Sequence, residues 1–355
     1  MDISVTELFT RATAEKVSDI FITSGAPIMF KKDGEIVPAT EGRMMPKDTA
    51  VVIEEVFRLS GSQAYDDYLK TGDCDFSFSI SGIGRFRINA FKQRNSMAAV
   101  IRVVQLTLSD TAQLGIPAAV LDLYKKNKGL ILVTGPAGSG KSTTLACIID
   151  AINKKRNCHI ITLEDPIEFL HRDNKSLVSQ REVSTDTESY MQALRASLRQ
   201  APDIILLGEM RDHDTIRTAI TAAETGHLVI STLHTVGAAN TIDRIVDIFP
   251  PEQQQQTRFQ LSMSLRMVVS QRLLPNTSGH SIPAFEIMRV NTAIGNLIRE
   301  AKTHQIDNVI QTSSQEGMIG MDAYILRLLR NGEISAEVAL MNASNPEQMK
   351  RIIGG

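Results

Sequence analysis

Residues 129–152 read GLILVTGPAGSGKSTTLACIIDAI, and they decide the fold of the longer part of the chain. The apolar run from Leu130 to Val133 indicates a buried strand, which leads into a glycine-rich loop and then into a helix with apolar periodicity. A Gly-x-x-x-x-Gly-Lys-Ser sequence between a strand and a helix is a phosphate-binding loop. The segment therefore predicts an α/β domain that binds ATP or GTP.

The glycines of this loop permit a tight turn whose amide groups converge on the phosphates. The helix that follows turns its positive dipole end toward the same anion. We expect Lys141 to contact the β- and γ-phosphates and the Ser142 hydroxyl to coordinate Mg²⁺. The predicted nucleotide-binding residues are Gly135, Pro136, Ala137, Gly138, Ser139, Gly140, Lys141, Ser142 and Thr143.

Two further apolar strands end in acidic residues. In CHIITLEDPIEF, residues 158–169, Glu164 is the candidate that orients or deprotonates the attacking water, and a helix cap or a salt bridge is its alternative role. In PDIILLGEMRD, residues 202–212, Glu209 fits a Walker B acid that holds Mg²⁺ directly or through water. Because ligands bind at the carboxyl ends of strands in open α/β sheets, we expect both acids beside the phosphates.

A third strand, HLVISTLHT at residues 227–235, has a histidine at each end. A single histidine at a strand end is more often structural, but two that flank one strand of a phosphate-loop domain favour contact with the γ-phosphate. His227 and His234 therefore join Glu164 and Glu209 as candidate catalytic residues.

The length of 355 residues fits roughly two domains of about 150 residues each. A net charge of −2 at pH 7 argues against a dedicated nucleic-acid binder. The chain begins MDISVTELF, without the apolar core of a signal peptide, and no apolar run reaches the roughly 18 residues that span a bilayer. We therefore expect a cytoplasmic protein without a transmembrane segment.

The sequence divides into an N-terminal α+β domain at residues 1–108, a linker at 109–117 and an ATPase domain with C-terminal helices at 118–355. The linker reads SDTAQLGIP, which interrupts the apolar patterns on either side of it.

In the first domain, helices are expected near residues 47–58 and 62–70, and Asp33–Gly34 predicts a hairpin turn. Alternating apolar and polar residues over 76–104 predict an antiparallel meander. Four arginines of this meander form a solvated strand face or reach a phosphate in a neighbouring subunit, and these are Arg85, Arg87, Arg94 and Arg102.

These elements, in this order, resemble the ATPases of type II secretion and type IV pili. The most specific marker is LRQAPDIILLGEMRD, residues 198–212, which is similar to the family signature without a mismatch. The resemblance implies a PAS-like N-terminal domain and a RecA-like ATPase domain with a helical C-terminal subdomain. It also implies that Glu164 is the catalytic glutamate, that Glu209 lies on the Mg²⁺ side and that His234 belongs to the nucleotide site.

Within the family, the chain most resembles the retraction ATPases of type IV pili. KVSDIFITSGAP at residues 16–27 and AAETGHLVISTLHT at residues 222–235 follow that group, and the chain lacks the four-cysteine zinc insert of many assembly and secretion relatives. One departure is Gly295, which stands where the motif Ala-Ile-Arg-Asn-Leu-Ile-Arg-Glu has its first arginine. Retraction is therefore less firmly implied than ATP hydrolysis.

The resemblance implies a homohexamer that uses ATP and Mg²⁺, in which each N-terminal domain packs on a neighbour's ATPase domain. Domain closure and release would turn an inner-membrane platform protein of the pilus, so the motor would be peripheral at the inner face of the cell membrane and would oppose the pilus assembly ATPase. An arginine from across the subunit boundary would stabilise the transition state. The candidates in the second domain are Arg195, Arg199 and Arg211.

Three other functions remain as alternatives. They are an assembly or secretion motor of the same family, a ring translocase of nucleic acid, and a ring that binds ATP with little hydrolysis. The nearly neutral charge counts against direct contact with nucleic acid, and the complete set of catalytic segments counts against the ring that does not hydrolyse ATP.

Overall fold

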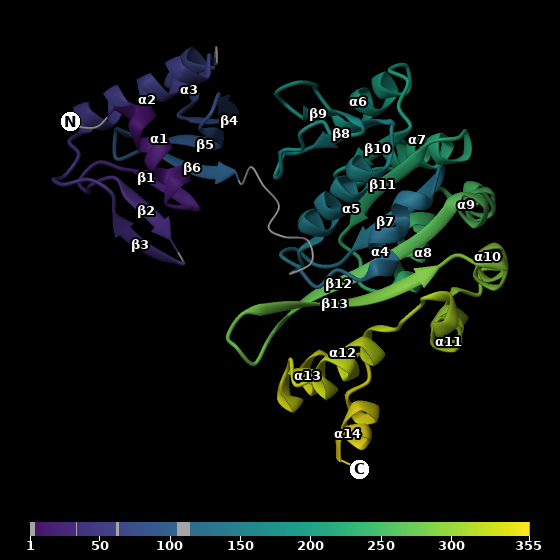
Figure 1. Ribbon diagram of the computed structural model, residues 1–355. Helices are drawn as coiled ribbons and strands as arrows, with labels where there is room; N and C mark the ends of the chain where they lie inside the picture. Colours follow the sequence, from purple (N-terminus) through teal and green to yellow (C-terminus); the bar gives the residue numbers. More distant parts are fainter. Residues whose placement is uncertain (1–3, 33, 62–63, 105–113, 355) are drawn as a thin grey trace. The chain divides into compact units, whose positions relative to one another are not determined.

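The computed structural model describes most of the chain, namely residues 4–32, 34–61, 64–104 and 114–354. The chain forms two compact units (Figure 1). The first unit comprises residues 1–107 together with residues 168–170, and the second comprises the rest of the chain. Residues 109–113 of the expected linker lie outside the described residues.

The first unit is built on a six-stranded antiparallel sheet with the order β3-β2-β1-β6-β5-β4. Its strands are β1 Asp19–Ile22, β2 Met29–Lys32, β3 Glu35–Pro38, β4 Asp73–Ile80, β5 Gly84–Gln93 and β6 Ser96–Val104. The helices that pack against this sheet are α1 Val5–Ala14, α2 Pro46–Ser60 and α3 Tyr65–Thr71.

The predicted elements of this unit are confirmed. Strands β4 to β6 form the meander, and α2 and α3 cover the two expected helices, except that residues 62–63 lie outside the described part. Strands β2 and β3 pair as a hairpin around residue 33, which is also outside the described part, and Gly34 has a φ of +87°. Such a positive φ is the reason that glycine is favoured at the turn.

Alternation along β5 separates an apolar face from a charged one. Phe86, Ile88 and Ala90 are fully buried in the core, whereas Arg85, Arg87 and Asn89 point to the opposite face because successive strand residues alternate. Arg102 of β6 pairs in register with Arg87, so Arg85, Arg87 and Arg102 share one face of the sheet.

The second unit contains a seven-stranded sheet with the order β13-β12-β7-β11-β10-β8-β9. All neighbours pair in parallel except the antiparallel edge strand β13. The strands are β7 Gly129–Thr134, β8 His159–Glu164, β9 Leu177–Glu182, β10 Ile204–Leu207, β11 Leu228–Leu233, β12 Leu265–Pro275 and β13 Ser281–Arg289.

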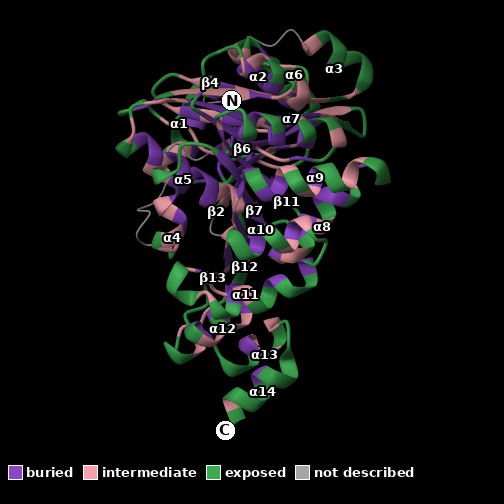
Figure 2. Cartoon of the chain, turned by 90° about the vertical axis from the view of Figure 1, so that its right-hand side faces the viewer, coloured by how far each residue is buried: buried purple, intermediate pink, exposed green. Residues whose placement is uncertain are grey.

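Helices cover both faces of this sheet, as expected for parallel strands. One face packs against α6 Tyr190–Ser197, α7 His213–Glu224, α8 Ala238–Asp247, α9 Pro251–Ser264, α10 Thr292–Arg299 and α11 Ile306–Thr312. The other face packs against α4 Ala118–Leu121, α5 Lys141–Lys155, α12 Met321–Arg330, α13 Ala336–Asn342 and α14 Pro346–Gly354. Figure 2 shows that buried residues gather on the strands, whereas α14 is mostly exposed.

Strand β7 divides its side chains between these two layers. Leu130 and Leu132 belong to the core beneath α6 to α11, whereas Ile131 and Val133 belong to the core beneath α5 and α12. Every residue of β7 is buried. The continuous apolar run in the sequence therefore reflects a central strand covered on both sides.

Three strands were not expected from the sequence. Edge strand β9 reads LVSQRE and lacks the apolar run of a buried strand. Strands β12 and β13 escaped prediction because α9 ends at Ser264 and β12 begins at Leu265. No Gly or Pro turn separates that helix from that strand, so the usual marker of a change in secondary structure is missing.

Gly295, which departs from the retraction motif, lies in the middle of α10 and is buried against α9. A β-carbon added there would meet only the carbonyl oxygen of Ser262, at 3.6 Å, which is an ordinary contact distance. The position therefore accepts a methyl group but lies at a packed interface between two helices.

Replacing Gly295 by alanine should raise the free energy of unfolding of the second unit by about 0.5–1 kcal/mol, because alanine loses less backbone entropy in a helix. Urea unfolding followed by circular dichroism measures this change. Gly279→Ala serves as the comparison, since its φ of +80° makes alanine unfavourable, and it should lower stability. A lower midpoint for Gly295→Ala would mean that α9 and α10 pack too tightly for one methyl group.

Candidate functional site

The phosphate-binding loop joins β7 to α5 as the sequence predicts. Helix α5 begins at Lys141, directly after Gly140 as its N-cap residue. Lys141 Nζ donates hydrogen bonds to the carbonyl oxygens of Gly135 at 2.8 Å and Pro136 at 2.9 Å. Ser142 and the following residues lie in the first turn of α5, where free backbone amides and the positive helix end favour an anion.

Glycine is required at both ends of this loop because strand β12 comes very close. A β-carbon at Gly135 would overlap the carbonyl oxygen of Gln271 and would lie 2.7 Å from Ser139 Oγ. A β-carbon at Gly140 would lie 2.8 Å from Gln271 Nε2. Both glycines also have positive φ values, +144° and +85°, which L-residues rarely adopt. The conformation of the loop therefore depends on these two positions.

The strand order brings the candidate residues to one edge of the sheet. Strands β7, β11, β10 and β8 are successive parallel neighbours, so their carboxyl ends lie in a row. The phosphate loop follows β7, His234 follows β11, Glu209 follows β10, and Glu164 ends β8. With about 4.8 Å between neighbouring strands, the row of strand ends from the phosphate loop to Glu164 spans about 15 Å. A nucleoside triphosphate and its attacking water can bridge this distance.

Two neutral side chains hold the carboxylate of Glu164. Its Oε1 accepts hydrogen bonds from Thr162 Oγ1 at 2.6 Å and from Gln180 Nε2 at 3.1 Å. Gln180 lies on β9 and is itself fixed, because its Oε1 accepts from the amide of His171 at 2.7 Å. Thr162 and Gln180 thus orient one oxygen of the partly buried Glu164 carboxylate, an arrangement suited to a base that takes a proton from water.

Glu209 lies two residues beyond β10 with its side chain only 13% exposed. Its Oε1 pairs with Arg211 Nη2 at 2.6 Å, and its Oε2 lies 3.3 Å from His234 Nε2. The hydrogen bond to Glu209 raises the pKa of Arg211. Carboxylate and hydroxyl oxygens are the ligands that Mg²⁺ prefers, so Glu209 and Ser142 are a donor set that fits this ion.

The sequence did not mark Tyr190, which the fold places among the acids of this edge. Its hydroxyl lies so close to Gly208 that a β-carbon there would be only 2.7 Å away. Burial first, and then the charges of Asp165, Glu209 and Glu164, raise the pKa of Tyr190. The phenol therefore stays protonated near neutral pH and can donate a hydrogen bond. No sequence motif indicates this residue, because its position depends on how α6 packs over β8 and β10.

His227 is a correction to the sequence prediction. It precedes β11, whose first residue pairs with Gly129 at the start of β7, so it lies at the amino edge of the sheet. The length of β11 separates it from His234 by about 20 Å. Its Nδ1 lies 3.1 Å from the carbonyl oxygen of Ala222, which is a structural contact. His227 therefore does not belong to the phosphate site of its own chain.

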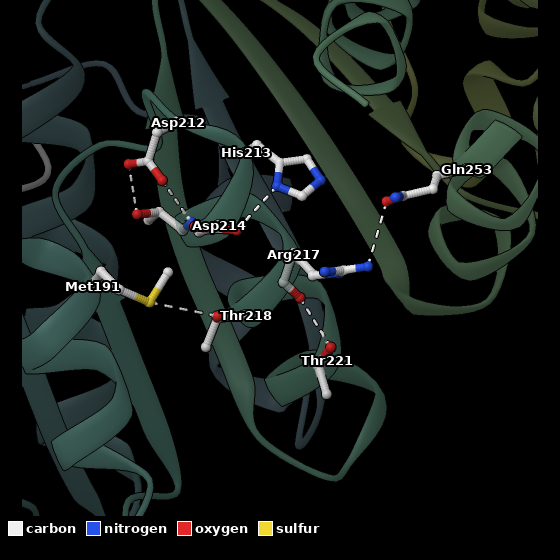
Figure 3. A network of polar contacts seen from close by, with 9 residues as sticks. Met191, Asp212, His213, Asp214, Arg217, Thr218, Thr221 and Gln253 are labelled. Carbon is white, nitrogen blue, oxygen red and sulfur yellow. Dashed lines mark hydrogen bonds and ion pairs between the residues drawn. The ribbon is translucent and has the colours of Figure 1, made fainter. Parts of the chain in front are cut away.

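Other charged residues of the signature also have defined places. Asp212 caps α7, since its carboxylate accepts from the amide of Thr215 at 2.8 Å and from its hydroxyl at 2.7 Å (Figure 3). Arg217 of the same helix reaches Gln253 of α9 at 3.3 Å. These contacts fix the N-terminal half of α7, which follows Glu209 in the chain.

Arg195 and Arg199 are exposed near the end of α6 from which the chain enters β10. The carbonyl oxygen of Gln200 lies 3.1 Å from the ring of His159, at the start of β8, so this end of α6 is at the amino edge of the sheet. Neither arginine faces the phosphate loop of its own chain. Arg211, in contrast, lies at the carboxyl edge of the sheet, where it forms an ion pair with Glu209.

Comparisons with known proteins agree on one family. The model of the family described as type II/IV secretion system protein matches residues 2–337. The type IV pilus retraction ATPase PilT of Pseudomonas aeruginosa is 43% identical over 97% of this chain and 99% of that protein, and a twitching motility protein of Neisseria gonorrhoeae is 47% identical over 79% of this chain and 76% of that protein.

Among solved structures, the crystal structure of the pilus retraction motor PilT with bound ADP matches with a TM-score of 0.91. The two sequences are 44% identical, and the match covers 99% of this chain and 100% of the chain in the crystal structure. The predicted fold class, a mixed α/β chain with an N-terminal domain and a RecA-like C-terminal domain, is thereby confirmed.

The loop geometry predicts a large effect of a single methyl group at Gly135. Gly135→Ala should raise the Kd for ADP about a hundredfold, because the new β-carbon would overlap Gln271 and force the loop to move. Isothermal titration calorimetry measures this change. Gly138→Ala is the matched control, since its φ is +75° but nothing lies within 4 Å, and its loss should be about tenfold. Equal losses in the two variants would contradict the steric argument.

Proposed function

The chain belongs to the type II/IV secretion system protein family, and we propose that it is the ATPase that drives the retraction of type IV pili. One observation carries the proposal. The phosphate loop, Glu164, Glu209 and His234 line one edge of a sheet, in a chain that matches an ADP-bound retraction motor over nearly its whole length.

Binding begins at the phosphate loop. The amides of the loop and the first turn of α5 receive the phosphates, and Lys141 exchanges its contacts with two loop carbonyls for oxygens of the β- and γ-phosphates. Ser142 and Glu209 would hold Mg²⁺, which when bound neutralises charge on the same phosphates. Arg211 and His234 keep the Glu209 carboxylate in place at the edge of the sheet.

Hydrolysis requires a base beyond the γ-phosphate. Glu164 ends the strand farthest along the row from the loop, where an attacking water would lie in line with the leaving group. Thr162 and Gln180 hold the carboxylate toward that water. The carboxylate accepts a proton from the water as the water oxygen bonds to the γ-phosphorus and the bond from that phosphorus to the oxygen of the departing ADP breaks. The neutral Tyr190 hydroxyl supplies a hydrogen-bond donor near Asp165, Glu209 and Glu164.

Conversion of hydrolysis into movement would involve a ring of subunits. We place the protein in a homohexamer in which the first unit of one subunit packs on the second unit of its neighbour. Support comes from the arginine-bearing sheet face of the first unit, which is not part of that unit's apolar core. These arginines, or Arg195 and Arg199, would then stabilise transition-state charge in a neighbouring subunit, an effect worth roughly 10³–10⁵ in rate in other P-loop enzymes.

The load would be a platform protein of the pilus in the inner membrane, with the motor bound peripherally at the inner face and opposed by the pilus assembly ATPase. Among the described residues, no helix has the length and apolar character needed to cross a bilayer. Attachment through a protein partner is therefore part of the proposal.

Assembly, rather than retraction, is the second candidate function, and Gly295 is the observation that favours it. The glycine removes the first arginine of the retraction motif and packs against α9 instead. The high identity to the retraction ATPase along the whole chain favours retraction.

Glu164→Ala should retain ATP binding and lose about 10²–10⁴ in turnover, because the water loses its base while the phosphate loop is unchanged. Phosphate release gives the turnover, and a fluorescent ATP analogue gives the affinity. Glu168→Ala, four residues away and exposed, is the control and should behave like the wild type. Unchanged turnover in Glu164→Ala would remove this residue from the catalytic role.

Deletion of the gene in its host should leave excess surface pili and no twitching movement. Wild-type protein should restore movement, and Lys141→Ala should not, because the loop then lacks its phosphate-binding amino group. Electron microscopy of pili and a twitching assay measure both properties. Loss of all pili would assign the motor to assembly, and normal pili with normal movement would assign it another load.

A further inference from the structure

Strand β12 lies directly beside the phosphate loop, although it is far from it in the sequence (Figure 1). It pairs in parallel with β7, and Ser270 is in register with Thr134, the last residue of β7. Gln271, the next residue, therefore stands opposite the first glycine of the loop. Its side chain is only 2% exposed, although it is an amide that needs hydrogen-bond partners.

Gln271 touches both ends of the loop and the helix behind it. Its Oε1 accepts a hydrogen bond of 2.7 Å from the hydroxyl of Thr144, which is 1% exposed and lies in the first turn of α5. Its carbonyl oxygen fills the space beside Gly135, and its Nε2 fills the space beside Gly140. One residue thus contacts the start of the loop, its end and the helix that receives the phosphates.

The same part of the hairpin also holds the segment after His234. Ser270 Oγ accepts from the amide of Gly237 at 3.0 Å. Glu286, which pairs with Ser270 across the hairpin, accepts from the amide of Ala238 at 2.8 Å. The phosphate loop and the histidine segment are therefore fixed by adjacent residues of one strand pair.

We propose that Gln271 is a positioning residue of the nucleotide site, which holds the phosphate loop in the conformation that receives the β- and γ-phosphates. Gln271 does not touch the phosphates itself, because its side chain is used on Thr144 and on the outer side of the loop. Its effect passes through the loop backbone. The inference rests on the proposed function, since it concerns how this ATPase binds its nucleotide.

A purely structural role is the rival explanation. The hydrogen bond between Thr144 and Gln271 is buried, so removal of one partner leaves an unpaired polar group and lowers stability wherever it lies in the protein. Replacement of both partners by apolar groups of similar shape restores much of that stability. Nucleotide affinity separates the two roles, because the apolar pair repairs packing without restoring the anchor of the loop.

The experiment uses the full-length protein and four variants, Gln271→Met, Thr144→Val, Thr144→Ser and the double variant Gln271→Met with Thr144→Val. Calorimetry gives the Kd for ADP, thermal unfolding without nucleotide gives stability, and phosphate release gives KM and kcat. Gln260→Met is a control for the same substitution, because Gln260 bonds Glu224 on the outside of α9 and α7. Gln180→Met is a contrast, because Gln180 holds Glu164 rather than the loop.

For Gln271→Met we expect the Kd for ADP and the KM for ATP to rise about tenfold, with kcat changed by less than about threefold. Thr144→Ser should bind like the wild type because it keeps the hydroxyl, and Thr144→Val should lose affinity like Gln271→Met. The double variant should recover its unfolding temperature but not its affinity. Gln180→Met should lower kcat and leave the Kd unchanged.

The inference is overturned if Gln271→Met binds ADP as the wild type does, or if the double variant recovers affinity together with stability. Failure of the wild-type protein to bind or hydrolyse ATP would instead overturn the proposed function. The two failures are therefore distinguishable, because the first is judged against an active wild type.

Discussion

Parallel pairing of β7, β11, β10 and β8 is the constraint on which the rest of the second unit depends. Because these strands run side by side in one direction, the segments that follow them meet at one edge although up to about a hundred residues separate them in the chain. The pairing is held by strands buried on both faces, so the positions of Glu164, Glu209 and His234 are set by the core and not by the loops that carry them. The site is thereby rigid where chemistry needs fixed distances.

The acids of this edge show how environment divides chemically similar groups. Glu164 is held by neutral donors, Glu209 by a guanidinium and an imidazole, and Asp212 by the amide and hydroxyl of a helix end. The carboxylate that Arg211 and His234 hold at the edge of the sheet offers the oxygen ligands that suit Mg²⁺. The one that accepts from Thr162 and Gln180 is oriented as a base, and the one that caps a helix has a structural role. The three roles therefore follow from the partners of each acid.

The sequence predicted the phosphate loop, the strands that carry the acids and the meander of the first unit, because each has a local pattern: a glycine motif, an apolar run or an alternation. It did not predict β9, β12 or the place of Tyr190, since those depend on contacts between distant segments. His227 was misplaced for a related reason. A residue at a strand end is obvious in the sequence, but which end of the sheet it occupies follows only when the direction of the strand relative to the loop is considered.

The stretch of β12 that leads to Gln271 has a fixed length, because from Met267 onward it is paired with β7 on one side and with β13 on the other. A register shift between Leu265 and Met267 interrupts the pairing with β7, and from Met267 onward the side chains alternate regularly between the two faces of the sheet. Insertion of one residue between Met267 and Ser270, within the regularly paired stretch, would exchange the faces of Ser270 and Gln271. Substitutions in this segment are therefore tolerated more easily than insertions or deletions. A length difference here between two relatives would mark a difference in how their nucleotide sites are built.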